Sequence, residues 1–400
     1  MDDIDIFVTN AYSHLDNGNV ECAEKILTAM KEMERTPKLE YSLGALLIEI
    51  GTVSRKMTYI DDGINIFKEL RDKTEYEVDY NLGNGYSSKY KIMVEKPNYL
   101  TKSKHVLTEA KKHYLNSLGK PNSEQLPLLY VNLGNTYDYI GRTIDALECY
   151  EKSPNHPHAL INKGIALCSY STFINNPTPI LKDAYECFEK VLKIKNVSIE
   201  FESLCNAHMK NIERYCGKEL LKERNDKKLK RQSNGTFEGF AENFCLNNKL
   251  YLNLCNFCQR CDNAIGDNIL IVGMLVKVGT PLEKDHYLKL SSQLNQIKLD
   301  YIISRFLLIL SQSDVKLLDL ISKNTILTET LSYEENNSSV QLLKNSFTGF
   351  YNILDKIFRN RYVFHELPPS CFLFKNLKAI IAQFHKEWNP EKFENLQING

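Results

Sequence analysis

The chain has 400 residues, of which 43% are hydrophobic and 25% are charged, a balance typical of soluble globular proteins. This length exceeds one compact core, so two or three domains, or an elongated array with an added domain, are expected. Fifty basic residues balance fifty acidic ones, which argues against a protein built mainly to coat nucleic acid but leaves room for a local basic site.

The first residues, MDDIDIF, lack the basic start and apolar stretch of a secretion signal. The most apolar runs, 269–278 and 301–310, are about half as long as the ~20 residues that a bilayer span needs. Eleven scattered cysteines without a secretion signal are expected to be reduced thiols. We therefore expect a cytoplasmic protein that makes no contact with membranes.

Two sequence blocks recur in the first half of the chain. YNLGNGY at 80–86 returns as VNLGNTY at 131–137, and DALECYEK at 145–152 returns as DAYECFEK at 183–190. The first block is typical of the leading helix of a tetratricopeptide-type helix pair, and the second of the trailing helix. The alternative is an unrelated helical bundle with coincidental spacing, which two independent near-identities disfavour.

Small residues are predicted at the points where the paired helices touch. The leading helices carry Gly44, Gly83, Gly134 and Gly164 at these points. The trailing helices show a small residue followed four positions later by a large apolar one, which should fill the groove against the next repeat; these steps are Ala23 to Leu27, Gly63 to Phe67, Ala110 to Tyr114, Ala146 to Tyr150 and Ala184 to Phe188. Between the paired helices, Gly18, Gly51 and Gly141 are predicted to end the leading helix in a left-handed turn.

These features predict an array over residues 1–195. It has about five repeats, at 4–36, 37–75, 76–120, 126–156 and 157–195, with insertions near 95–103 and 171–179. Such an α-solenoid presents a concave face to a protein or peptide partner. Asn81, Asn84, Asn132 and Asn135 on the leading helices are the predicted partner-binding residues, and the equally weighted alternative is that they bridge neighbouring repeats.

Residues 196–232 are predicted to form a basic connecting helix. The stretch from 218 to 231 contains seven Lys and Arg residues and only three acidic residues. They predict either a contact with phosphate or nucleic acid or a solvated helix with ion pairs four residues apart, and the second interpretation is favoured.

Residues 233–400 are predicted to form a separate bundle of helices. Apolar spacing predicts helices at 237–246, 285–312, 340–361 and 369–388, while 269–278 fits a strand or a buried helix. The helix at 285–312 should bury Leu288, Leu294, Ile297, Tyr301, Arg305 and Leu308, and the helix at 340–361 should bury Leu343, Phe347, Phe350, Leu354 and Ile357.

Two constellations in this region carry candidate chemistry. Cys245, Cys255, Cys258 and Cys261 include a C-x2-C-x2-C run that suits zinc, although buried apolar cysteines are the favoured alternative and no cofactor is predicted. Arg359-Asn360 and His365 form an R-x5-H pattern: the guanidinium would hold a phosphodiester while the imidazole moves a proton. The alternative is that both side chains cap helix carbonyls.

Short blocks along the chain resemble a bacterial group that joins tetratricopeptide repeats to a C-terminal HEPN domain (higher eukaryotes and prokaryotes nucleotide-binding). The resemblance rests on the repeats together with FCLNNKLYLN at 244–253, LNQIKLDYIISRFLL at 294–308 and NILDKIF at 352–358. It implies an all-α protein with a bundle of four to five helices. It also implies dimers that cleave RNA without metal through an R-x4–6-H motif, often in toxin–antitoxin or phage-defence systems.

Two departures from the group affect this interpretation. The group is expected to carry its Arg-Asn and His pair in a segment after the LDKI helix, so Arg359 and His365 are either a displaced site or a coincidence, and the domain is expected to be incomplete at its C-terminus. The group also does not require the cysteines. The leading hypothesis is a repeat scaffold coupled to an RNA-binding or RNA-cleaving HEPN-like module, and the alternative is a non-catalytic interaction protein with a degenerate or truncated bundle.

Overall fold

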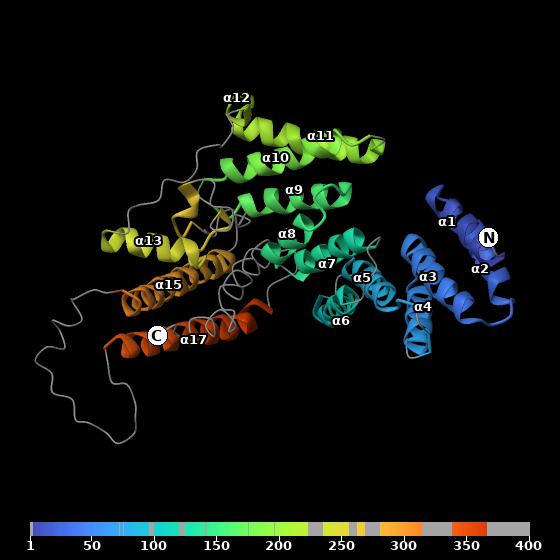
Figure 1. Cartoon of the computed structure of the whole chain (residues 1–400), viewed down its shortest axis with the longest axis horizontal. Coiled ribbons are helices and arrows are strands. Elements are labelled where there is room, and N and C mark those ends of the chain that lie inside the picture. Colours follow the sequence, from blue (N-terminus) through green and yellow to red (C-terminus); the bar gives the residue numbers. More distant parts are fainter. Residues whose placement is uncertain are drawn as a thin grey trace, which may run out of the picture. The chain divides into compact units, whose positions relative to one another are not determined.

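A computed structural model describes the chain at residues 3–71, 73–74, 76–95, 100–119, 125–140, 142–174, 176–195, 197–222, 235–255, 262–268, 281–313 and 338–365. The regular elements in these residues are helices, which confirms the predicted all-α fold (Figure 1). Contacts divide the chain into unit 1, residues 1–166 with 190–202, and unit 2, residues 167–189 with 203–400. The predicted boundaries at 195 and 232 stay predictions.

Unit 1 is a series of helix pairs. Each leading helix contacts the trailing helix that follows it, and the leading helices α1, α3, α5 and α7 also contact one another in order. This sequential pattern is that of an α-solenoid, in which each pair contacts only its neighbours. The helices are α1 (Asp3–Asp16), α2 (Val20–Lys31), α3 (Pro37–Ser54), α4 (Met57–Leu70), α5 (Asp79–Val94), α6 (Leu100–Leu118), α7 (Leu126–Ile140), α8 (Thr143–Glu151) and the start of α9 (Pro157–Ser171).

Three of the predicted small residues on the leading helices, Gly44, Gly83 and Gly134, lie where paired helices touch, and the role of Gly164 stays a prediction. A Cβ atom added to Gly83 would lie 2.5 Å from the ring of Tyr114, and one added to Gly134 would lie 2.5 Å from the ring of Tyr150. The prediction that these rings fill the groove against the next repeat was incomplete, because each ring lies on the glycine of its own pair. The missing Cβ leaves a space on the leading helix that a flat aromatic ring fills.

The prediction for the turn glycines is correct at one position and wrong at another. Gly18 has a φ of 75° and lies between α1 and α2. Gly51, however, lies inside α3, which continues to Ser54 and ends at Arg55 with a φ of 58°. Gly51 instead permits close packing, because an added Cβ would lie 2.7 Å from the Ile60 side chain. Gly141 lies outside the described residues.

Unit 2 contains the remaining helices. The predicted helix at 237–246 is present as α13, and the predicted connecting helix is divided at Gly217, which has a φ of 80°. The segments predicted at 269–278 and 369–388 lie outside the described residues. The elements that bear on this unit are α10 (Thr178–Leu192), α11 (Ile199–Cys216), α12 (Lys218–Lys222), α13 (Phe237–Asn247), η1 (Asp262–Ala264), α15 (Pro281–Ser311) and α17 (Ser338–His365).

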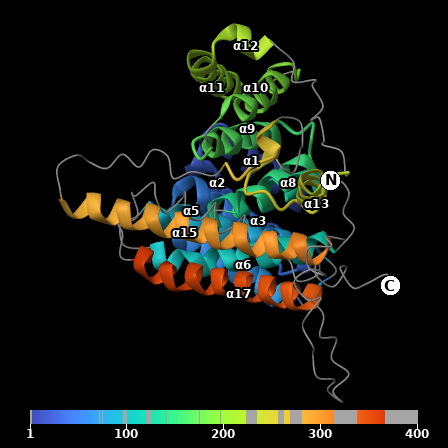
Figure 2. The same ribbon diagram turned by 90° about the vertical axis from the view of Figure 1, so that its left-hand side faces the viewer.

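Helices α15 and α17 lie side by side as an antiparallel hairpin (Figures 1 and 2). Small residues allow the close approach: Ser346 Oγ donates a hydrogen bond of 2.7 Å to the Ser304 carbonyl oxygen, and a Cβ added to Gly349 would lie 2.1 Å from Ser304 Oγ. The hairpin shares one apolar core with the segment that follows α13. That core consists of Leu252, Ile297, Tyr301, Leu308, Phe350 and Ile353.

The predicted buried stripes are partly wrong. On α15, Leu288 is 53% exposed, although four of the predicted residues, Ile297, Tyr301, Arg305 and Leu308, are buried. On α17, Leu343 and Phe347 are exposed at 37% and 53%, and the buried face runs instead through Ser346, Phe350 and Ile353. The tight contact at Ser304 turns the small side of α17 toward α15, so the larger side chains lie further round the helix. Leu294, Leu354 and Ile357 are outside the described side chains.

In the described part of the chain, every helix falls short of the length and apolar content that crossing a bilayer requires.

Candidate functional site

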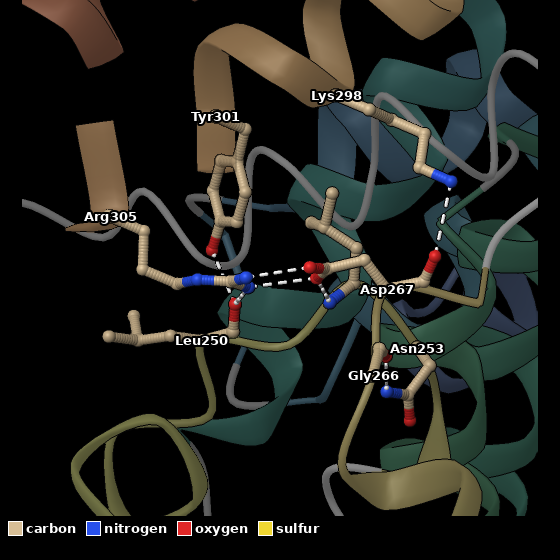
Figure 3. A network of polar contacts seen from close by, with 8 residues as sticks. Leu250, Asn253, Gly266, Asp267, Lys298, Tyr301 and Arg305 are labelled. Carbon is tan, nitrogen blue, oxygen red and sulfur yellow. Dashed lines mark hydrogen bonds and ion pairs between the residues drawn. The ribbon is translucent and has the colours of Figure 1, made fainter. Parts of the chain in front are cut away.

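A buried arginine organises the polar contacts of unit 2. Arg305 on α15 is only 8% exposed. Its Nη1 donates to the Leu250 carbonyl oxygen and to Asp267 Oδ1, both at 2.8 Å, and its Nη2 donates to Asp267 Oδ2 at 2.6 Å (Figure 3). Burial opposes the charge of Arg305, but the hydrogen bonds and charge of Asp267 outweigh burial, so the pKa of the guanidinium is raised. The pair therefore stays ionised and fixes the loop to the helix.

Neighbouring groups extend this network. Tyr301 Oη donates to the Leu250 carbonyl oxygen at 2.9 Å, and the Leu252 amide donates to Asp267 Oδ1 at 2.8 Å. Lys298 Nζ donates to the Asp267 carbonyl oxygen at 3.1 Å, and burial lowers the pKa of Lys298 while the nearby Asp267 charge opposes that effect. Because the carboxylate of Asp267 already neutralises Arg305, the arrangement suits positioning of backbone better than capture of an anion.

Sequence reasoning placed Arg305 on the buried stripe but did not name its partner. An arginine among buried apolar positions is almost always paired with a carboxylate, so its place in the stripe was a signal that a buried acid exists. Asp267 is 38 positions away along the chain, and periodicity gives no information about that pairing.

The predicted partner-binding residues form a ladder along the leading helices of unit 1. Asn81 Nδ2 donates to Tyr41 Oη on the preceding leading helix at 2.8 Å. Asn132 Nδ2 donates to Asn84 Oδ1 at 3.0 Å and to Tyr80 Oη at 3.2 Å. These amides therefore connect adjacent helix pairs, as the bridging alternative requires.

The second asparagine of each block is held by the trailing helix as well. Asn135 Oδ1 accepts hydrogen bonds from Tyr150 Oη at 2.8 Å and from Asn162 Nδ2 at 2.7 Å. Asn84 Oδ1 accepts in the same way from Tyr114 Oη at 2.8 Å. The oxygen of each amide is thus turned into the ladder, which fixes the orientation of a half-buried side chain. Contact of these residues with a partner stays a prediction.

A carboxylate on the same set of helices has an altered environment. Glu49 on α3 is exposed, yet the surrounding protein removes part of its hydration and raises the pKa of its carboxyl; Lys91 lowers this pKa and Asp16 raises it. Burial, followed by the charge of Glu49, raises the pKa of Tyr12 on α1 to about 12. Acidic, basic and phenolic groups from α1, α3 and α5 therefore lie near one another in unit 1.

The backbone of the candidate catalytic residues is helical. Arg359, Asn360 and His365 all lie within α17, which ends at His365. Six residues of α-helix advance about 600° and about 9 Å, so the positions of Arg359 and His365 differ by about 120° around the helix axis. One helix by itself therefore does not place the two positions on the same face.

The candidate metal ligands are only partly described. Cys245 and Cys255 are buried at 2% and 3% exposure, while Cys258 and Cys261 lie outside the described residues. Among the described side chains, no cluster of three or more His, Cys, Asp or Glu residues is arranged to hold a metal ion. Of the basic stretch, Lys218 is described, and its exposed ammonium lies 3.3 Å from Glu213.

The comparison with known families bears on this hairpin. Residues 282–398 match the family model for LA2681-like HEPN domains, and this range begins within α15 and includes all of α17. The C-terminal region contains a HEPN domain. The α15–α17 hairpin belongs to this HEPN domain, and the Arg305 network connects to it residues of two described stretches, 248–255 and 262–268, that precede the matched range.

No curated protein matches the chain. The crystal structure of the apo form of RapI is similar at a TM-score of 0.35 and 14% identity, covering 99% of this chain and 100% of that one.

Proposed function

We propose that the chain is a sensor and effector in one polypeptide, in which the helix-pair array binds a protein or peptide and the HEPN domain binds and cleaves RNA. The observation that carries the proposal is the HEPN match at 282–398 on the same chain as an α-solenoid. A solenoid has an extended face for a partner, and HEPN proteins commonly act on RNA. In this proposal, the protein acts in bacterial stress responses or in defence against phage.

In the active form, three residues of α17 carry out metal-independent cleavage. Arg359 holds the scissile phosphate, Asn360 orients it, and His365 transfers the proton between the ribose 2′-hydroxyl and the leaving oxygen. No metal ion is required, because the guanidinium offsets the charge that develops on the phosphate.

The test is RNA cleavage by the purified full chain in the presence of a chelator. We expect cleavage by the unaltered protein. His365→Ala should lower the rate by at least about 100-fold, the usual contribution of a positioned acid or base, and Arg359→Ala by about 100-fold or more, because it removes the charge that stabilises the transition state. The matched control is Asn345→Asp, an exposed change on the same helix. Cleavage that needs a divalent metal, or that survives His365→Ala, contradicts the assignment.

A second copy of the chain is the proposed partner of the HEPN domain. Helix α15 carries an exposed apolar stripe of Leu299, Ile303 and Phe306, which are 54%, 57% and 48% exposed. The stripe has no charged residue, so two copies meet in a two-fold arrangement without like-charge repulsion. On a single α17 the Arg359 and His365 positions lie about 120° apart around the helix axis, so they do not share a face. A homodimer contains two copies of α17, so the Arg of one copy and the His of the other can face the same cleft.

A non-catalytic interaction protein is the competing function. The same angular separation of Arg359 and His365 favours it, because residues of one cleft ordinarily share a face. In that case the HEPN domain serves as an association module, and RNA stays intact under all the conditions above while the partner of the array still binds.

A further inference from the structure

The segment between α13 and α15 contacts two separate parts of unit 2. Its described residues, 248–255 and 262–268, are called the connector below. At one end, the Asp267 carboxylate and the Leu250 carbonyl oxygen accept hydrogen bonds from Arg305 of the HEPN hairpin (Figure 3). At the other end, Asn263 Nδ2 donates a hydrogen bond of 2.8 Å to the carbonyl oxygen of Asn176, which lies between α9 and α10.

Hydrogen bonds also brace the connector internally. Asn268 Nδ2 donates to the Asn263 carbonyl oxygen at 3.1 Å, and the Asp267 carboxylate accepts the Leu252 amide at 2.8 Å. Asn253 Nδ2 donates to the Gly266 carbonyl oxygen, which joins the two described parts. Hydrogen bonds therefore link Asn176 to Asn263, Asn263 to Asn268, and Asp267 to Arg305, and the peptide bond between Asp267 and Asn268 completes the route.

The HEPN end of this route is the most strongly held part. The Arg305 guanidinium also lies over the rings of Tyr251 and Tyr301, with its central carbon 5.1 Å and 5.4 Å from their centroids. A buried bidentate ion pair with this support resists rearrangement, because breaking it leaves an uncompensated buried charge. The hairpin and the connector should therefore move together.

We infer that the connector is a rigid link that transmits displacement between the α9–α10 connection and the HEPN hairpin, with Arg305 as its positioning residue. A partner that shifts the α9–α10 connection would alter the position of α15 through Asn263 and Asp267. This use of the link rests on the proposed sensor and effector function, but the mechanical coupling itself does not.

Hydrogen exchange of the full chain, followed by mass spectrometry, tests the coupling. Asp267→Asn should accelerate exchange about tenfold or more at 248–255 and also around Asn176. Asn263→Ala removes one side-chain hydrogen bond near the surface and should accelerate exchange at 298–305 on α15. The control is Lys356→Gln, which removes the ion pair between Lys356 and Asp300 on the same hairpin and should leave exchange around Asn176 unchanged.

Hydrogen exchange around Asn176 distinguishes transmitted displacement from a purely local stabilising role of Asp267. If Asp267→Asn changes exchange only in the connector and α15, while residues around Asn176 exchange as before, the inference is wrong. Arg305→Lys keeps the charge and should give an effect between the unaltered protein and Arg305→Met. If Asp267→Asn does not fold, Asn263→Ala is the deciding variant. Unchanged hydrogen exchange at 298–305 of α15 in that variant would then overturn the inference. RNA cleavage is not part of this readout, so failure of the proposed function leaves the result interpretable.

Discussion

At the scale of single residues, the packing of unit 1 depends on glycines that face aromatic rings. Because Gly44, Gly83 and Gly134 have no side chain, the space beside each on the leading helix is filled by an aromatic ring of the trailing helix. These rings belong to Phe67, Tyr114 and Tyr150. All three of these rings are at most 2% exposed, so the surrounding core has little room to adjust.

Gly83→Ala should therefore destabilise the protein by about 1–2 kcal/mol, because overpacking against Tyr114 outweighs the better helix propensity of alanine. Urea denaturation followed by circular dichroism measures the change. Gly119→Ala is the control, since its added Cβ meets no atom closer than 3.4 Å, and it should be close to neutral. Equal stability of both variants would show that Tyr114 moves aside without cost.

The environment of Glu49 leads to a pH-dependent prediction. The pKa of Glu49 is higher in the folded than in the unfolded chain, so its ionisation opposes folding at neutral pH. Glu49→Gln should stabilise the protein at pH 7, by no more than about 0.5 kcal/mol because the side chain is exposed. The gain should shrink as the pH falls through the folded-state pKa and disappear below about 4, under the usual value for glutamate. Urea midpoints across this range measure it, and a gain that does not change with pH would contradict the prediction.

At the scale of elements, the α15–α17 hairpin depends on small side chains at its crossing. The Ser304, Ser346 and Gly349 positions allow the two helices to approach closely, and the Tyr301 and Phe350 rings, with centroids 5.5 Å apart, pack beside them. This contact decides which face of α17 is buried.

Gly349→Ala should separate the two helices and destabilise the hairpin by about 1–3 kcal/mol. The nearest obstacle is Ser304 Oγ, at 2.1 Å from the added Cβ. Ser304→Ala removes that atom and should restore part of the loss in the double variant. Hydrogen exchange at 297–308 and 346–353 measures both effects, and a double variant no better than Gly349→Ala would show that the clash lies elsewhere.

At the scale of the whole molecule, the exposed stripe on α15 predicts the oligomeric state. Light scattering should report a dimer for the unaltered chain and a monomer for Ile303→Glu, because each two-fold contact would bury two new carboxylates. Asn345→Asp, an exposed change on α17, should remain a dimer. A monomeric unaltered protein would exclude association through this stripe.

The sequence by itself determined the helix pairs and the presence of a helical C-terminal module. The glycine and aromatic spacings lie within one or two helices, so they are legible in a short stretch of chain. It also placed Arg305 on a buried face, since periodicity fixes which positions of a helix share a side.

Only the tertiary structure decided how those helices meet. The pairing of Arg305 with Asp267, the bridging bonds of Asn81 and Asn132, and the buried face of α17 join residues that are far apart in the chain. Such contacts depend on the distance and rotation between helices, which small side chains such as Ser304 and Gly349 set once the elements have packed. A periodic pattern shows which face is apolar, but it does not show what that face meets.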